Sequence, residues 1–218
     1  MHTFFGNKGV NAFSTLESLR GQQTSCSRRS DTAAVVRPTE ALAYYTVREG
    51  SRVQAYPPGL KVVAGDMTAR APQSLHVVWW TCAVPGVVAA AAVPPADCST
   101  NAIRARRRST TRGPRSDLVG IQLHVRFPDC WDGRHLDSAD HHRHMAYSRG
   151  EVCPRDHPVK VPSLILIVDY PLASGRGVTL ASGGRLSGHG DFFNAWNQSA
   201  LKAIVRDCVA GRPRCGRH

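Results

Sequence analysis

The sequence predicts a mainly β fold of the β-sandwich type with a few short helices, and an α+β arrangement is the alternative. Residues 121–127 alternate apolar and polar side chains with the period of two that is typical of a half-buried strand. Residues 164–168 are apolar throughout and lie between Pro162 and Pro171, which indicates a central strand buried on both faces. Only residues 198–209 combine the length and the apolar stripe of a long helix.

The remaining elements follow from local signals. Ser14 and Glu17 form a capping box that predicts a brief helix ending at Gly21. The segments 60–63 and 75–81 are rich in β-branched and aromatic residues and predict two more strands. The second contains Trp79 and Trp80, which we expect in the core. We expect one domain over residues 1–218.

The charge of the chain comes mainly from arginine. The formal net charge is +12, and 24 of the 28 basic residues are arginines. Six arginines fall between Arg104 and Arg115, within a segment, 99–117, that has no periodicity and is expected to be a basic surface insertion. No helix-turn-helix, zinc-finger or RNA-binding motif accompanies them, so nucleic acid is disfavoured as a partner. The longest apolar run, 84–95, is short and interrupted by prolines, and we expect no membrane span.

The seven cysteines are dispersed and form no CxxC pair. This distribution favours disulfides in an oxidising compartment over a zinc or redox site, so we expect a secreted protein. The odd count and the absence of a signal peptide before His2 suggest a truncated start. On this hypothesis a signal peptide and an eighth cysteine lie upstream.

One stretch, from Phe127 to Tyr147, concentrates titratable and turn-forming side chains that are costly to bury. Further histidines occur in two distant blocks, one at the start of the chain and one near residue 190. If the three blocks converge, paired histidines and carboxylates suit general acid–base chemistry. The candidate catalytic residues are His2, Asp132, Asp137, Asp140, His141, His144, His189 and Asp191. The candidate substrate-binding residues are Trp131, Tyr147, Asn194 and Trp196.

Two alternatives apply to the same residues. Aspartates in Asp-Gly and Asp-Ser contexts often cap turns through their own backbone, which is the structural interpretation of Asp129 and Asp137. His141 and His144 are three residues apart, which fits two ligands of a divalent metal. A third ligand would have to come from His2, His189 or an acid. No other cofactor is indicated.

Several motifs together resemble a known family. They are His2-Thr3-Phe4-Phe5-Gly6-Asn7, Pro58-Gly59-Leu60, the stretch from Phe127 to Tyr147, and the stretch from Gly188 to Trp196. These blocks are similar to the DUF1996 family, secreted bacterial and fungal proteins with no assigned biochemical role. The resemblance runs nearly end to end and implies a signal peptide and a cysteine-containing segment before His2. Asn197 stands where an aspartate is common in the family.

Three functions remain open at this stage. We expect a carbohydrate-active enzyme, a glycoside hydrolase or lyase that acts as a monomer on an extracellular or cell-wall polysaccharide. The alternatives are a non-catalytic glycan- or wall-binding module and a basic nucleic-acid-associated protein. Disulfides that close short loops would join Cys82 to Cys98, Cys130 to Cys153 and Cys208 to Cys215. Cys26 would then pair with the upstream cysteine.

Overall fold

The computed structural model describes residues 36–47, 52–83, 89–98 and 120–209. The expected helix at 14–21, the basic segment 99–117, His2 and Cys26 lie outside these ranges. The described elements are mostly antiparallel strands followed by one short helix, and the prediction of a mainly β fold is confirmed. The strands are β1 (Glu40–Thr46), β2 (Lys61–Gly65), β3 (Val78–Cys82), β4 (Ile121–Arg126), β5 (Cys130–Trp131), β6 (Met145–Ala146), β7 (Val159–Lys160), β8 (Ser163–Tyr170) and β9 (His189–Phe193).

The largest sheet has four strands in the order β1-β8-β4-β3. Its inner face carries the apolar residues that the period-two pattern predicts, including Ile121, Leu123 and Val125 of β4. β8 is central in this sheet, as expected, but it is not fully buried, because Leu164 and Val168 are buried on the inner face while Leu166 is only partly buried there. Ile165 and Ile167 point to the other face and remain half-buried, which corrects the prediction of burial on both sides.

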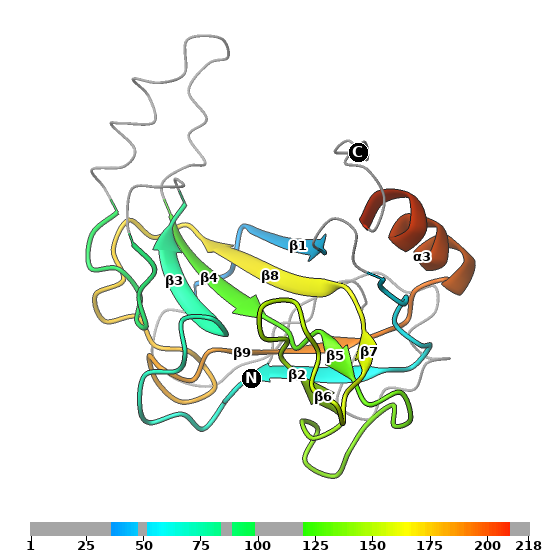
Figure 1. The fold of residues 1–218 in the computed structure, drawn as a ribbon. Coiled ribbons are helices and arrows are strands. Elements are labelled where there is room, and N and C mark those ends of the chain that lie inside the picture. The colour runs from blue at the N-terminus through cyan, green and yellow to red at the C-terminus, as the bar shows by residue number, and fades with distance from the viewer. Residues whose placement is uncertain (1–35, 48–51, 84–88, 99–119, 210–218) are drawn as a thin grey trace, which may run out of the picture.

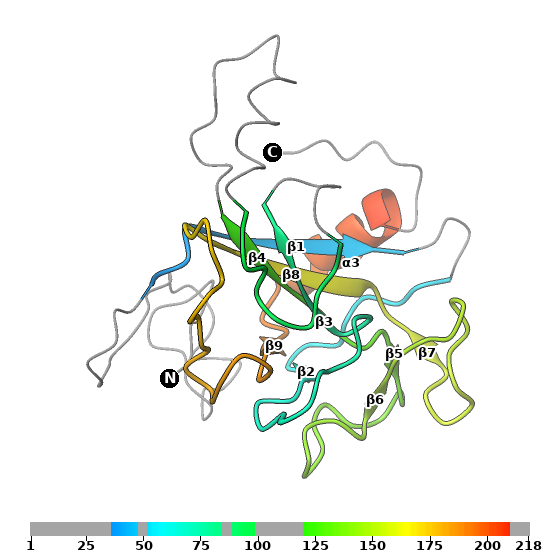
Figure 2. The ribbon, with the colours of Figure 1, turned by 90° about the vertical axis from the view of Figure 1, so that its left-hand side faces the viewer.

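The second layer is the two-stranded sheet β2-β9, which lies across the inner face of the four-stranded sheet (Figures 1 and 2). Val62 and Ala64 of β2 belong to the same buried core as the inner side chains of β4. Gly190 of β9 allows a close approach, because a Cβ there would lie 3.0 Å from the Phe127 ring. The two layers together form a small sandwich.

The third sheet is short and has the order β6-β5-β7. The disulfide Cys130–Cys153 ties β5 to the loop before β7, and Cys82–Cys98 closes the loop after β3. Both pairings were predicted and both are confirmed. Cys208 is also disulfide-bonded, and its predicted partner, Cys215, lies outside the described residues.

The strand that contains Trp79 and Trp80 begins later than the predicted residue 75. The amides of Val77 and Val78 both donate to the Ser74 carbonyl, so residues 75–77 form a turn and β3 begins at Val78. Trp80 is in the core, as expected. Trp79 points to the outer face of the sheet and is half-buried, which corrects its assignment to the core.

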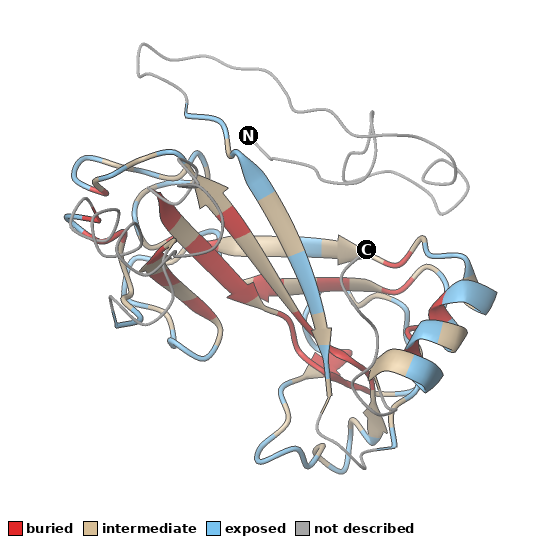
Figure 3. Cartoon of the chain, turned by 90° about the horizontal axis from the view of Figure 1, so that it is seen from above, coloured by how far each residue is buried: buried red, intermediate tan, exposed pale blue. Residues whose placement is uncertain are grey.

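The helix at the C-terminal end begins as α3 (Gln198–Ile204) and continues as a π-helical turn, η2 (Val205–Val209). Leu201 and Val205 bury its apolar side, while most of its surface is exposed, as is much of β1 (Figure 3). The Asn197 side chain accepts from the Ala200 amide, so it caps the helix as an aspartate would. Within the described ranges, no helix is long and apolar enough to cross a membrane.

Candidate functional site

The polar stretch between β5 and β6, residues 132–144, folds back onto the first residue of β2. The Lys61 amide donates to the Leu136 carbonyl at 2.9 Å. The Lys61 carbonyl lies 2.7 Å from Nε2 of His144, and because a carbonyl can only accept, this nitrogen is the donor of the bond. We call residues 132–144 the site loop. Its position is therefore fixed by both backbone groups of Lys61.

His144 is the internal anchor of the site loop. It is 1% exposed. Its second ring nitrogen, Nδ1, lies 2.8 Å from the Ser138 hydroxyl. Both nitrogens are thus used within the protein, and the ring is covered. In this structure His144 positions the loop and presents no nitrogen to a substrate or a metal ion.

His141 is oriented toward solvent by a carboxylate. Its Nδ1 lies 2.7 Å from Asp137 Oδ1, and its side chain is 60% exposed. Asp137 is held in turn by the Lys61 ammonium at 3.3 Å. Although burial raises it, the hydrogen bonds from His141 and Lys61 bring the pKa of Asp137 below its ordinary value. His141 also has a φ of 57°, an uncommon left-handed conformation for a residue other than glycine.

Asp132 and Asp140 cap turns of the site loop. Asp132 accepts from the amides of Arg134 and His135 and from the His135 ring. Burial raises the pKa of Asp132, but these hydrogen bonds outweigh it and the net shift is downward. The Asp140 carboxylate accepts from the Arg143 amide, and this bond is the largest cause of its lowered pKa. Both carboxylates are therefore held in the ionised form.

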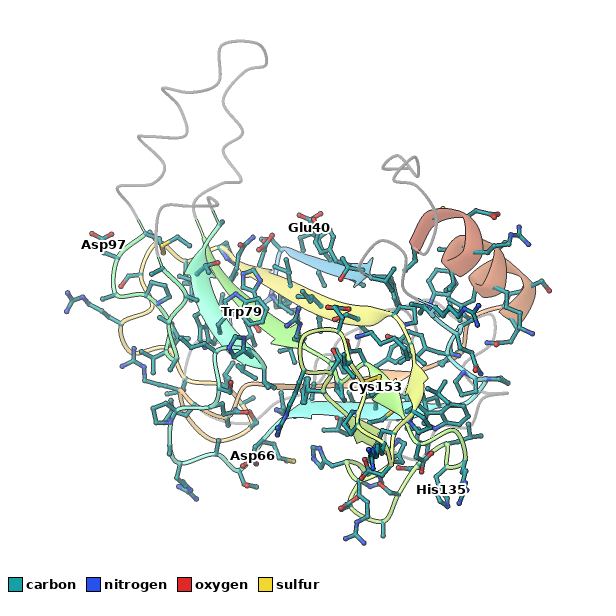
Figure 4. All side chains as sticks on the ribbon, in the orientation of Figure 1. Glu40, Asp66, Trp79, Asp97, His135 and Cys153 are labelled. Atoms are coloured by element: carbon teal, nitrogen blue, oxygen red, sulfur yellow. A yellow bond between two sulfur atoms is a disulfide. The ribbon has the colours of Figure 1, made fainter. Side chains whose placement is uncertain are left out.

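The outer face of β2-β9 brings the site loop close to the block around residue 190. The paired residues Val62 of β2 and Phe192 of β9 point into the core. Their sequence neighbours Lys61 and Asp191 therefore point outward, because successive side chains of a strand alternate between faces. Asp66, just after β2, has a lowered pKa, first through hydrogen bonds from Thr68 and then through the charges of His142 and His189. Histidines of two distant segments are thus near enough for their charges to act on one carboxylate. Figure 4 shows Asp66 and His135 on this same side of the molecule.

The four candidate substrate-binding residues are not equivalent. Trp131 is 8% exposed and donates its indole N–H to the His135 carbonyl. Asn194 is fully buried and its amide bonds two backbone carbonyls. Tyr147 and Trp196 keep more accessible ring surface: Tyr147 donates to the Arg126 carbonyl, and Trp196 is 42% exposed. Only these last two present substantial aromatic surface to a ligand.

The residues do not assemble a metal centre in the part of the chain that the structure describes. Within it, no group of three or more histidine, cysteine or acidic side chains is arranged to hold an ion. His141 and His144 point in different directions, one to solvent and one to the Lys61 carbonyl. His2, a proposed third ligand, lies outside the described residues.

Several residues of the site were not singled out from the sequence. Lys61 and Asp66 lie at the ends of β2, far along the chain from the polar stretch, and no local signal connects them with it. Ser138 bridges Asp140 and His144 through its hydroxyl. The alternation along β2 could have placed Lys61 on an outer face, but its partner depends on how the loop folds.

Comparison with known proteins adds a family but no activity. A family model described as a domain of unknown function (DUF1996) matches residues 1–196. No curated protein matches the chain, and no solved structure does.

Proposed function

This chain belongs to the DUF1996 family, and for it we propose the role of a secreted enzyme that cleaves an extracellular or cell-wall polysaccharide. The observation that carries the proposal is the His141–Asp137 pair. An exposed imidazole is bonded through Nδ1 to a carboxylate, and Lys61 holds that carboxylate from the other side. The second ring nitrogen of His141 is the group that would take up or release the proton.

The pair has the features of a pre-oriented base. A carboxylate on one ring nitrogen fixes the tautomer of the imidazole and stabilises its charged form. The left-handed backbone of His141 is an uncommon conformation that the hydrogen bonds of the site loop maintain, and such outliers concentrate at functional sites. His142, His189 and Asp66 extend the polar surface along the outer face of β2-β9.

The state of the carboxylates favours a histidine-centred mechanism over the usual pair of acids. Glycoside hydrolysis by two carboxyl groups needs one of them protonated at the working pH. Asp132, Asp137 and Asp140 all have lowered pKa values, so they are ionised near neutrality. We therefore assign the proton transfer to His141 and the orienting role to Asp137.

A non-catalytic glycan-binding module is the second candidate. The exposed rings of Tyr147 and Trp196 favour it, because aromatic faces suit contact with sugars without any chemistry. Disulfides are compatible with an extracellular location in either case. The arginine-rich segment lies outside the described residues, so nucleic acid binding is supported only by the amino-acid sequence. The affinity for nucleic acid would fall steeply as the salt concentration rises.

The test is the release of new sugar ends from a panel of cell-wall polysaccharides. Unsaturated ends would report elimination, and reducing ends without unsaturation would report hydrolysis. His141→Ala should abolish release, while His76→Ala, which removes another exposed histidine, should leave it unchanged. Release that survives His141→Ala would refute the assignment. Silence from folded wild-type protein across the panel, with retained binding to one polysaccharide, would favour the binding module.

A further inference from the structure

A buried lysine in the three-stranded sheet plays no part in the proposed cleavage. The side chains of Lys160, on β7, and Asp129, directly before β5, are only 9% and 8% exposed. Nζ of Lys160 lies 2.6 Å from Oδ2 of Asp129. The backbones of the two segments are also joined, because the Val161 amide donates to the Asp129 carbonyl. An amine and a carboxyl group are therefore held in contact where little water reaches them.

Ser148 connects these two groups by hydrogen bonds. Its amide donates to Oδ1 of Asp129 at 2.8 Å, and its hydroxyl donates to Oδ2 at 2.9 Å. The Lys160 ammonium donates to the same hydroxyl oxygen, also at 2.9 Å. A proton can therefore pass from the lysine through the hydroxyl to Oδ2. The amide at the same time directs its dipole at Oδ1.

A second carboxylate completes the cluster. Oε2 of Glu151 lies 3.2 Å from Nζ of Lys160, and the Glu151 side chain is 39% exposed. Glu151 has a φ of 71°, which is uncommon for a residue with a side chain and is maintained here in a tight turn. Reciprocal hydrogen bonds between Arg149 and Val152 close that turn. The closer and more buried Asp129 is thus placed to react with the amine, and the more exposed Glu151 to exchange protons.

The fold favours an amide over two separate charges at this position. Removing two charged groups from water is costly, even when they are paired. An amide between them is neutral, and its oxygen can keep the hydrogen bond from the Ser148 amide. Two groups held in contact on one chain react without a further loss of translational freedom. Exclusion of water from the cluster also disfavours hydrolysis of the product.

We propose that Lys160 and Asp129 condense within the folded protein to form an amide cross-link, with Glu151 as the proton carrier. One proton of the ammonium passes through the Ser148 hydroxyl to Oδ2, which leaves a neutral amine beside a carboxylic acid. The nitrogen lone pair forms a bond to Cγ, and the Ser148 amide stabilises the negative charge that develops on Oδ1.

The remaining steps release one water molecule. Glu151 takes a second proton from the nitrogen, which now has four bonds. The Cγ–Oδ2 bond then breaks as the double bond to Oδ1 forms again, and Oδ2 takes the proton from Glu151 and leaves as water. The third proton stays on the amide nitrogen. Glu151 returns to its carboxylate form, and the reaction consumes no oxidant, reductant or cofactor.

The cross-link adds a second covalent tie to the sheet from which the site loop emerges. It joins positions 31 residues apart, beside the bridge between Cys130 and Cys153, and Figure 4 labels Cys153 at this sheet. Thiols reduce a disulfide but do not cleave an amide, so the sheet stays tied when the disulfide is reduced. The inference goes beyond the proposed cleavage and does not depend on it.

The test is the intact mass of the denatured full chain after its cysteines have been reduced and alkylated. We expect a mass that is lower than the sequence requires by one water molecule. Because trypsin does not cleave after an acylated lysine, the digest should contain residues 127–134 joined to residues 156–176. Lys160→Met and Asp129→Ala should each have the full mass of their sequences. Lys202→Met, the same change at an exposed lysine, should keep the deficit.

Two further variants separate the chemistry from the fold. Asp129→Asn should still condense, and its deficit should equal one ammonia molecule, because a side-chain amide releases ammonia in place of water. Glu151→Gln keeps Lys160 beside Asp129 and should leave most chains uncondensed.

Three outcomes would overturn the proposal. One is the full sequence mass in wild-type protein that circular dichroism shows to be folded. Another is a loss of water located at Asp132–Gly133, where an aspartate before a glycine can cyclise by itself. Complete condensation of Glu151→Gln would overturn the role of Glu151 as proton carrier.

Discussion

Replacing His144 should damage the fold, whereas replacing His141 should damage only the chemistry. His144 is buried, and its two ring nitrogens bond the Lys61 carbonyl and the Ser138 hydroxyl. In His144→Ala the carbonyl loses its partner, which costs about 1–3 kcal/mol, and the missing ring leaves a cavity that adds to it. We expect a total loss of about 2–4 kcal/mol in the free energy of unfolding.

The corresponding drop in melting temperature is about 5–15 °C for a chain of this size. His141→Ala should change the free energy of unfolding by less than about 1 kcal/mol, because its pair with Asp137 is largely exposed. Thermal and urea unfolding of both variants, followed by far-ultraviolet circular dichroism, measure the difference. A His144→Ala protein that melts within about 2 °C of the wild type would refute the anchoring role.

Three further sets of variants test a disulfide, a buried ion pair and the raised pKa of Asp169. Cys130→Ser with Cys153→Ser opens a loop of 23 residues and should lower the free energy of unfolding by about 3 kcal/mol in urea titration; no change would contradict a stabilising bridge. In the Glu151→Gln background, which keeps the ion pair, Asp129→Ala leaves the buried Lys160 ammonium without its closest carboxylate, at 2.6 Å, and should lower the free energy of unfolding by about 3 kcal/mol in urea titration. The additional change Lys160→Met should restore most of this loss, and no rescue would contradict the role of the ion pair. The pKa of Asp169 is higher in the folded state than in the unfolded state, so ionisation of this carboxyl destabilises the fold. The wild type should therefore lose stability relative to Asp169→Asn as the pH rises above about 4. Parallel curves of unfolding free energy against pH for the two proteins would contradict this.

The strands were the most predictable part of the fold. The alternation over residues 121–127 predicted β4, which ends one residue earlier at Arg126, and its inner face, because the side-chain period of a strand is local. The uniform run at 164–168 has no such alternation, and the sequence alone did not show that Ile165 and Ile167 lie on an outer face. Trp79 was misplaced for a similar reason: two adjacent tryptophans on a strand must point to opposite faces, and only Trp80 is in the core.

The candidate site was predictable as a region but not in its internal roles. The density of acids and histidines between Phe127 and Tyr147 predicted a candidate site, and the structure shows that most of these residues form the loop between β5 and β6. Whether a histidine is an anchor or an exposed base depends on burial, which distinguishes His144 from His141 although they are three residues apart. The turn-capping interpretation of Asp129 is wrong, because its carboxylate accepts from the amide and hydroxyl of Ser148 and from the Lys160 ammonium, which lie far along the chain. It does describe Asp137, which accepts from the amide of Ser138.

By itself the sequence determined the β-rich class, the short disulfide loops and the polar stretch, because each depends on residues close together along the chain. Only the tertiary structure decided which distant groups meet. Lys61 joins Asp137 because the site loop folds onto β2, and Glu40 meets Asp169 and Gln122 because three strands share one register. Local periodicity assigns a side chain to a face of a strand, but the neighbouring strand and its register follow from packing of the whole core.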